Sequence, residues 1–316
     1  MLSFFPILYS DELLYSALAR YHIRSGNRNF KQTDLELFGY SSQQICKVTL
    51  TNNLNFLVNN LSLLSQQTVN NLLQNHTLYP FYATFLMPQE AWLLKNSLSK
   101  KFTEAIVEIT KAANDYSGDS KKYLKFCLYC IEEDTKKYGE PYWHRFHQIP
   151  GVMICPIHRI ALDNSLVQIG TKEIHYYAAS YDNCPCNAST KIYNDATLQK
   201  LLLFAYDIEW FINNNLTFKG LPWLQNQYKT YLANKNFITV LSREKFVFHA
   251  QEFYKAILAY YEQDFLEAIN PKIIKDGEQY FAKCLLACDI SPVIDRITHL
   301  LLIKFLANSI EDFFKK

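Results

Sequence analysis

Two pairs of metal-ligand side chains lie in the middle of the sequence. Cys127 and Cys130 are separated by two residues, and Cys155 and His158 repeat that spacing after an interval of 24 residues. Zinc is bound by four sulfur or nitrogen ligands at the corners of a tetrahedron, and a pair with this spacing reaches one ion from a tight knuckle. The pattern C-x2-C-x24-C-x2-H therefore predicts a closed zinc site with no open position for water, which is structural rather than catalytic.

Two other interpretations of Cys127 and Cys130 are weaker. A thioredoxin-like redox pair opens a helix that follows a strand within a βαβ unit, and no such unit is visible in the sequence. Two ordinary buried thiols would not explain the matching pair, Cys155 and His158. The N-terminus lacks the basic segment and cleavage site of a signal peptide, and no apolar stretch is long enough to span a membrane. We therefore expect a cytoplasmic protein whose cysteines are reduced.

Two further groups of residues are candidates for a second metal. His144 and His147 lie between the two ligand pairs; they either help to bind a second, catalytic metal or pack and hydrogen-bond within the zinc module, and we favour the latter. Cys184 and Cys186, with His175 upstream, form a candidate second zinc site, although their spacing is tighter than that of the usual knuckle.

Catalytic motifs are missing from the sequence. It contains no G-x-x-x-x-G-K-[ST], G-x-G-x-x-G, G-x-S-x-G or H-E-x-x-H pattern, and a content of only eight glycines argues against a phosphate-cradling loop. We therefore expect a protein that is not an enzyme. The competing hypothesis is a zinc-dependent hydrolytic enzyme that holds a second, open metal with His144, His147 and His175.

The elements that must position the metal site are predicted to be mostly helical. Apolar residues make up 49% of the chain and aromatic residues 15%, as in a well-buried globular protein. Ser10 is expected to cap a first helix, with Asp11 and Glu12 at its positive end and Gly26 as its stop. A second, short helix over 33–39 would complete a helix-turn-helix, which either contacts DNA or is a plain packing unit.

The sequence divides into three parts. Residues 1–115 are expected to form a helical N-terminal domain with the helix-turn-helix-like start, and 116–194 a compact zinc-binding module with short β-like runs. From 195 to 316 helical periodicity returns. The predicted fold is mainly α, with a zinc-ribbon-like module between two helical units.

Nucleic-acid contacts must be local, because a net charge of +2 gives no overall basic field. Arginines cluster near the end of the first helix, lysines lead into the first cysteine pair, and two arginines lie near the metal ligands. Such side chains contact phosphates, although the same pattern equally fits solvated helix faces. The candidate DNA-binding residues are Arg20, Arg24, Arg28, Lys121, Lys122, Lys125, Arg145 and Arg159.

Three stretches together resemble the TniQ family, which includes the TnsD target selectors of transposons. They are "FFPILYSDELLYSALARYHIRSG", "NHTLYPFYATF" and "FCLYCIEEDTKKYGEPYWHRFHQIPGVMICPIH". The last matches the family's zinc signature in ligand spacing and in its tyrosine–glycine–glutamate and tryptophan block. The resemblance covers roughly residues 4–165. Leu128 and Arg159 depart from the family's usual residues, and neither is a ligand.

The resemblance implies a non-enzymatic adaptor whose Zn²⁺ is held by Cys127, Cys130, Cys155 and His158. Such a protein binds the double-stranded DNA of a chromosomal attachment site through zinc-finger and helix-turn-helix elements, or docks on a CRISPR RNA-guided complex without binding a specific DNA sequence itself. It then recruits an AAA+ ATPase that regulates transposition. The long helical segment after the zinc module favours the TnsD type, which reads its attachment site itself.

Overall fold

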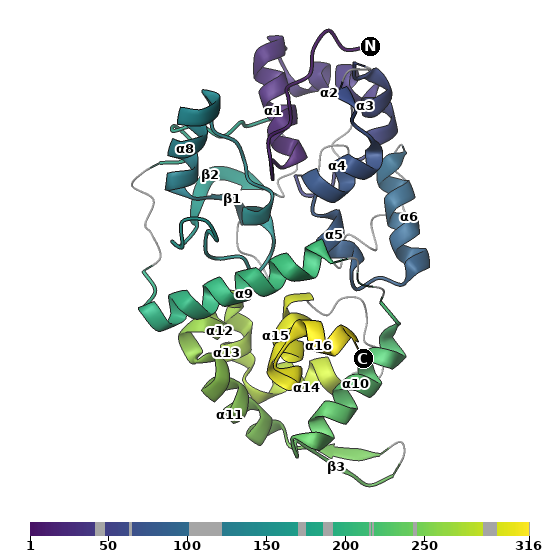
Figure 1. Ribbon diagram of the computed structural model, residues 1–316, viewed down its shortest axis with the longest axis vertical. Coiled ribbons are helices and arrows are strands. Elements are labelled where there is room, and N and C mark those ends of the chain that lie inside the picture. The colour runs from purple at the N-terminus through teal and green to yellow at the C-terminus, as the bar shows by residue number, and fades with distance from the viewer. Residues whose placement is uncertain are drawn as a thin grey trace.

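The computed structural model of the protein is built almost entirely from helices (Figure 1). The N-terminal helices lie on one side of the long helix α9, next to a small mixed α/β module, and the C-terminal helices lie on its other side. No helix among the described residues is long and apolar enough to cross a membrane. The described residues are 1–41, 48–62, 65–100, 122–169, 175–185, 192–214, 216, 218–242, 245–286 and 296–315.

The N-terminal unit begins with the two helices that the sequence predicts. Helix α1 ends at Gly26, whose φ of 69° gives the left-handed cap expected there. Helix α2 starts earlier than expected, because the side chain of Asn29 accepts a hydrogen bond from the backbone N–H of Gln32. The helices are α1 (Leu14–Ser25), α2 (Phe30–Phe38), α3 (Leu54–Asn60), α4 (Val69–His76), α5 (Tyr79–Ala83) and α6 (Pro88–Ser99).

The predicted start of the first helix is wrong. Helix α1 has Leu13 at its N-cap position with no side-chain cap, so Ser10 does not cap it. Asp11 takes a positive φ of 53°, and Glu12 is fully buried instead of lying at an exposed helix end. Both acids have partners elsewhere in the chain, as described below.

The middle module pairs two strands that are distant in sequence. Strand β1 (Lys122–Phe126) runs antiparallel to β2 (Asp163–Ile169), with an irregularity between Tyr123 and Lys125. Between them lie helix α8 (Leu128–Tyr138) and the 3-10 turn η2 (Phe146–Gln148). A two-stranded ribbon next to a helix and a turn, with a cluster of cysteines and a histidine, agrees with the predicted zinc-ribbon-like module.

The C-terminal unit packs around one internal helix. Ten of the twelve residues of α15 are buried, so apolar side chains lie on every face of the helix, which is typical of a helix in the centre of a domain. Asn194 caps α9 through the N–H of Thr197. The elements are α9 (Asp195–Asn213), α10 (Leu221–Asn234), β3 (Ile238–Val240), β4 (Phe246–Phe248), α11 (Ala250–Tyr261), α12 (Gln263–Ile269), α13 (Pro271–Asp276), α14 (Glu278–Leu286), α15 (Arg296–Ala307) and α16 (Ile310–Lys315).

The segment before α1 connects the N-terminal unit to the middle module. The backbone N–H of Leu13 donates to the carbonyl of Trp143, and the N–H of Arg145 donates to the carbonyl of Asp11 at 2.6 Å. The Asp11 carboxylate also accepts from Arg145 Nε at 3.2 Å and from the N–H of Phe146 at 3.1 Å. Trp143 is only 1% exposed, so this junction is part of the core.

Candidate metal centre

Two tight turns bring the predicted zinc ligands together. Cys127 follows β1 as the N-cap residue of α8, and Cys130 lies in the first turn of that helix. Cys155 and His158 lie in the turn between Ile154 and Ala161, which are themselves joined by an isolated β-bridge. The pairing of β1 with β2 places the two turns side by side.

The four ligand atoms form a compact cluster. The Nδ1 atom of His158 lies 3.4 Å from the sulfurs of Cys127 and Cys130 and 3.6 Å from that of Cys155. The sulfurs of Cys130 and Cys155 are 3.7 Å apart. A tetrahedral zinc ion with ordinary bond lengths has edges of about 3.8 Å between sulfurs and about 3.5 Å between sulfur and nitrogen. The cluster therefore has the dimensions that a zinc ion requires.

Side chains that contact the four ligands favour the binding of a cation. Glu133 Oε1 lies 3.2 Å from His158 Nε2, an arrangement that orients a metal-binding imidazole and increases its basicity. Hydrogen bonds from Cys127 and Cys130 lower the pKa of the Cys155 thiol, and a further bond from His147 acts in the same direction. The three cysteines are at most 3% exposed. All of these features fit a buried Cys3His zinc site.

Cys127 and Cys130 share one feature with a thioredoxin-like redox pair. Cys127 and Cys130 do open a helix that follows a strand, which the sequence did not reveal. However, β1 pairs with β2 antiparallel, so no βαβ unit exists there. The decisive observation is that Cys155 and His158 lie against the first pair.

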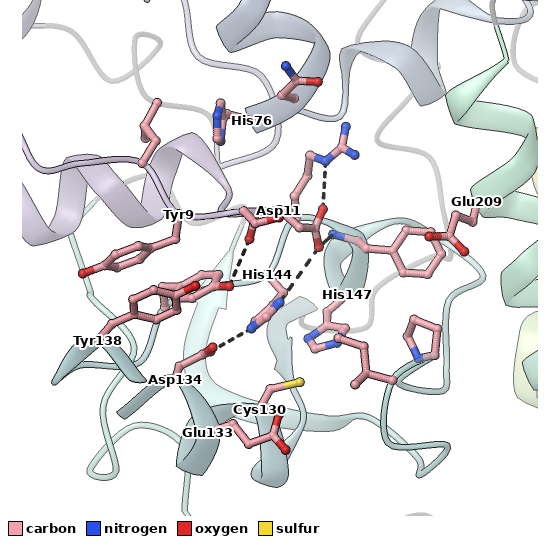
Figure 2. A pocket seen from close by; sticks show the side chains of 18 of the residues that line it. Tyr9, Asp11, His76, Cys130, Glu133, Asp134, Tyr138, His144, His147 and Glu209 are labelled. Carbon is pink, nitrogen blue, oxygen red and sulfur yellow. Dashed lines mark hydrogen bonds and ion pairs between the residues drawn. The ribbon is translucent and has the colours of Figure 1, made fainter. Parts of the chain in front are cut away.

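His144 and His147 lie beside Cys130, at the edge of a pocket (Figure 2). His144 Nε2 is 2.8 Å from Asp134 Oδ2, and the His144 ring stacks on Tyr142. Burial lowers the pKa of His147, which favours its neutral form. Cys130, His144 and His147 each offer a ligand atom, and these three atoms all lie within 4.8 Å of one another.

The pocket has a volume of about 740 Å³ and lies where the three parts of the chain meet. Asp11 and His76 line it from the N-terminal unit, and Glu209 lines it from α9. Asp11 Oδ2 is 4.0 Å from His144 Nδ1. The pocket therefore reaches the histidines directly.

Among the described residues, His175 does not form a group of potential metal ligands with His144 and His147. Its exposed ring lies edge-on against Phe30. Cys184 is buried and its thiol lies 3.5 Å from the side-chain carbonyl of Asn183. Within the described part of the chain neither residue belongs to a group of three potential ligands, and Cys186 lies outside the described residues, so a site shared by these three stays a prediction.

Arg20 has a different role from the one predicted. It is 3% exposed, and its Nη1 donates to both carboxylate oxygens of Glu12 at 2.9 Å. Its Nε donates to Glu140 Oε1 at 2.7 Å, and its guanidinium lies over the ring of Tyr9. The Arg20 side chain is therefore committed to the junction between α1 and the middle module and does not face a DNA backbone. This cluster was not predicted from the sequence. The one local signal near it is Gly139, which marks the end of α8 and lies directly before Glu140.

Two more of the predicted DNA-binding residues are engaged within the protein. Lys125 Nζ donates to the carbonyls of Ile149 and Val152, at 3.1 and 2.5 Å. Arg145 Nη1 donates to the carbonyl of Gln74 at 2.7 Å, in addition to its bond with Asp11. Lys125 thus bonds within the middle module, and Arg145 ties that module to the N-terminal unit.

The remaining candidates are exposed or lie beyond the described atoms. Arg28 and Arg159 are exposed, and the Arg24 side chain is 47% exposed although it also contacts Glu140 at 2.6 Å. Lys121 lies outside the described residues, and of Lys122 only the backbone, in β1, is described. Arg24, Arg28 and Arg159 are thus the described candidates that are accessible to a phosphate.

Comparison with known proteins gives two family matches that follow each other along the chain. Residues 3–162 match the TniQ family, and residues 204–316 match the family described as Tn7-like transposition protein D. The chain is also 28% identical over 157 residues to the transposon Tn7 transposition protein TnsD of Escherichia coli. That alignment covers 49% of this chain and 30% of the relative, so the chain spans under a third of the relative's length. Because the first family match extends over half of the chain and includes the whole Cys3His cluster, the protein belongs to the TniQ family.

Proposed function

We propose that the protein selects target sites for transposition by binding the DNA of a chromosomal attachment site and recruiting an AAA+ regulator. The observation that carries this proposal is the order of the two family matches, TniQ followed by Tn7-like transposition protein D, which together cover most of the chain. The proposed role is recognition and recruitment, and it requires no catalytic step.

The proposed DNA surface lies around the turn between α1 and α2. Arg24, Arg28 and Lys31 are all exposed there, together with the uncharged side chains of Asn29 and Gln32. Cations on a helix pair of this kind contact phosphates, and polar side chains beside them reach base edges. We assign Arg159, on the knuckle of the metal site, to a further phosphate contact.

The proposed zinc site acts as a structural anchor. Zinc held by Cys127, Cys130, Cys155 and His158 would fix the start of α8 against the turn that carries His158. Glu140 lies two residues after the end of α8 and binds Arg20 and Arg24 of α1. We therefore propose the division into an N-terminal domain (1–115), a zinc-binding module (116–194) and a C-terminal domain (195–316), in which the module orients the N-terminal DNA surface.

The test is a selection of genomic DNA. Purified, zinc-loaded protein is mixed with fragmented host DNA at near-physiological salt, and the retained fragments are sequenced. Enrichment of one short locus supports direct reading of an attachment site. Uniform recovery that disappears as salt rises contradicts it, because phosphate attraction alone is sequence-independent. In that outcome a CRISPR RNA-guided complex becomes the source of specificity.

Matched variants locate the surface. Arg28→Ala combined with Lys31→Ala should weaken DNA binding and reduce the slope of log K against log salt by roughly 2, since each phosphate contact contributes about 0.9. Lys275→Ala, an exposed lysine on α13, is the control and should leave both quantities unchanged. An unchanged slope in the double variant would place the DNA elsewhere on the protein.

Recruitment is tested separately. The AAA+ ATPase encoded by the same transposon is immobilised and exposed to this protein with and without the enriched DNA. Retention of the protein supports the adaptor role, and no retention in either condition contradicts it.

A further inference from the structure

A second group of metal ligands lies directly beside the Cys3His cluster and shares one residue with it. The ligand atoms of Cys130, His144 and His147 lie within 4.8 Å of one another, and all three side chains are buried. They come from separate segments, namely the first turn of α8, the bridge to Glu12, and the turn η2. Figure 2 shows both imidazole rings close to the Cys130 side chain.

The chemistry of this group suits a zinc-like cation. Imidazole and thiolate are the ligands that Zn²⁺ and Co²⁺ prefer, and the distances between the ligand atoms need to contract by up to about 1.5 Å to reach a tetrahedral geometry. The carboxylate of Asp134, 2.8 Å from His144 Nε2, supplies the partner that usually orients a metal-bound histidine. His144 thus has a carboxylate partner in Asp134 and lies close to the Cys130 sulfur, as a metal-binding histidine does.

We propose that the protein binds a second divalent cation through Cys130, His144 and His147, with the Cys130 thiolate bridging this cation and the one in the Cys3His site. Charge supports the arrangement, because the three thiolates and the nearby carboxylates of Glu133 and Asp134 carry enough negative charge to balance two divalent cations. The positive side chain nearest to the histidines in sequence, Arg145, is already paired with Asp11.

The two sites differ in access. The Cys3His site has four protein ligands and is closed. The second site has three protein ligands, and its fourth position opens toward the pocket of about 740 Å³. A cation there exchanges with solvent more easily and accepts water or a side chain of a bound partner as its fourth ligand. This inference does not depend on the proposed role in transposition.

The experiment is a metal titration of the full chain. Metal-free protein, reduced and refolded under argon, is titrated with Co²⁺, and zinc-loaded protein is measured by elemental analysis after equilibration at fixed free zinc. We expect two equivalents per chain, with the second removed by a weak chelator that leaves the first in place. The second Co²⁺ should add to the sulfur-to-cobalt absorption, since Cys130 binds both ions.

Variants assign the second ion. His144→Gln and His147→Gln should each retain one equivalent, and Asp134→Asn should weaken the second ion by about 10–100-fold. Cys184→Ser removes a buried thiol outside both groups and should still retain two. A wild-type chain that saturates at one equivalent overturns the proposal whatever the variants do. Loss of the second ion in Cys184→Ser with both histidine variants unaffected also overturns it.

Discussion

Removing the guanidinium of Arg20 should strongly destabilise the protein, because it leaves the carboxylate of Glu12 buried without a cation. Glu12 is fully buried, and both of its oxygens accept from Arg20 Nη1 at 2.9 Å. Desolvation by burial raises the pKa of Glu12 even though Arg20 opposes the shift. The substitution Arg20→Met keeps most of the aliphatic volume and removes only the charge and its hydrogen bonds.

The size of the effect follows from the burial of both partners. Breaking a buried ion pair by removing one member costs about 3–5 kcal/mol. Unfolding entropies of about 2.1 cal/mol/K per residue give roughly 0.7 kcal/mol/K for the 316 residues of the chain. If the chain unfolds in one transition, Arg20→Met should lower Tm by roughly 4–8 °C. The exposed Arg28→Met is the matched control, and a surface change of this kind stays within about 0.5 kcal/mol.

A double-mutant cycle tests the reasoning. Thermal unfolding is followed by circular dichroism at saturating zinc for Arg20→Met, Glu12→Gln and the double variant. The double variant should be less destabilised than the sum of the two single variants, by about 1–3 kcal/mol, because the buried charge is gone along with its partner. A loss below about 1 kcal/mol in Arg20→Met, or strict additivity in the cycle, would refute a buried, energetically coupled pair.

Three further outcomes are expected. Burial lowers the pKa of His299 from 6.5 to about 3, so the stability contributed by the neutral imidazole is present above pH 6.5 and is lost as the pH falls toward 3. Between pH 7 and pH 5, His299→Gln should therefore lose about 2 kcal/mol less stability than the wild type, as measured by thermal unfolding. Gly151→Ala should lower the free energy of unfolding in urea by about 1–3 kcal/mol more than Gly139→Ala does. Both glycines have a positive φ, but only a Cβ at position 151 would lie 2.7 Å from the Ile297 side chain. Equal losses of stability in the two variants would contradict this packing. Stripping zinc with a strong chelator should expose the buried Trp143 and shift tryptophan fluorescence to the red, and restoring zinc should reverse the shift.

Ligand spacing carried most of what could be predicted about the site. The repeated two-residue interval depends only on local chain geometry, so Cys127, Cys130, Cys155 and His158 could be grouped without knowing the fold. The helical character of both flanking units and the left-handed stop at Gly26 were predictable for the same reason.

What the sequence did not reveal depends on contacts between distant segments. Glu12 was expected at the positive start of a helix, but it is buried with Arg20, whose guanidinium also bonds to Glu140 from a segment 120 residues away. Arg20 looked like a phosphate contact for the same reason, since a lone arginine on a helix gives no sign that it is buried. Glu133 and His147 support the ligands from positions that only the assembled turns define.

The bond between the N-terminal segment and the middle module has a consequence for synthesis on the ribosome. Asp11 bonds to Arg145, 134 residues further along, and Ser10 accepts from Tyr142 across 132 residues. At about 5–20 residues per second, the start of the chain waits roughly 7–27 s before its partners have been made. During that interval α1 lacks the surface that covers it in the folded protein. The face of α1 that packs on the middle module therefore stays uncovered on the nascent chain until the metal-binding turns have been made.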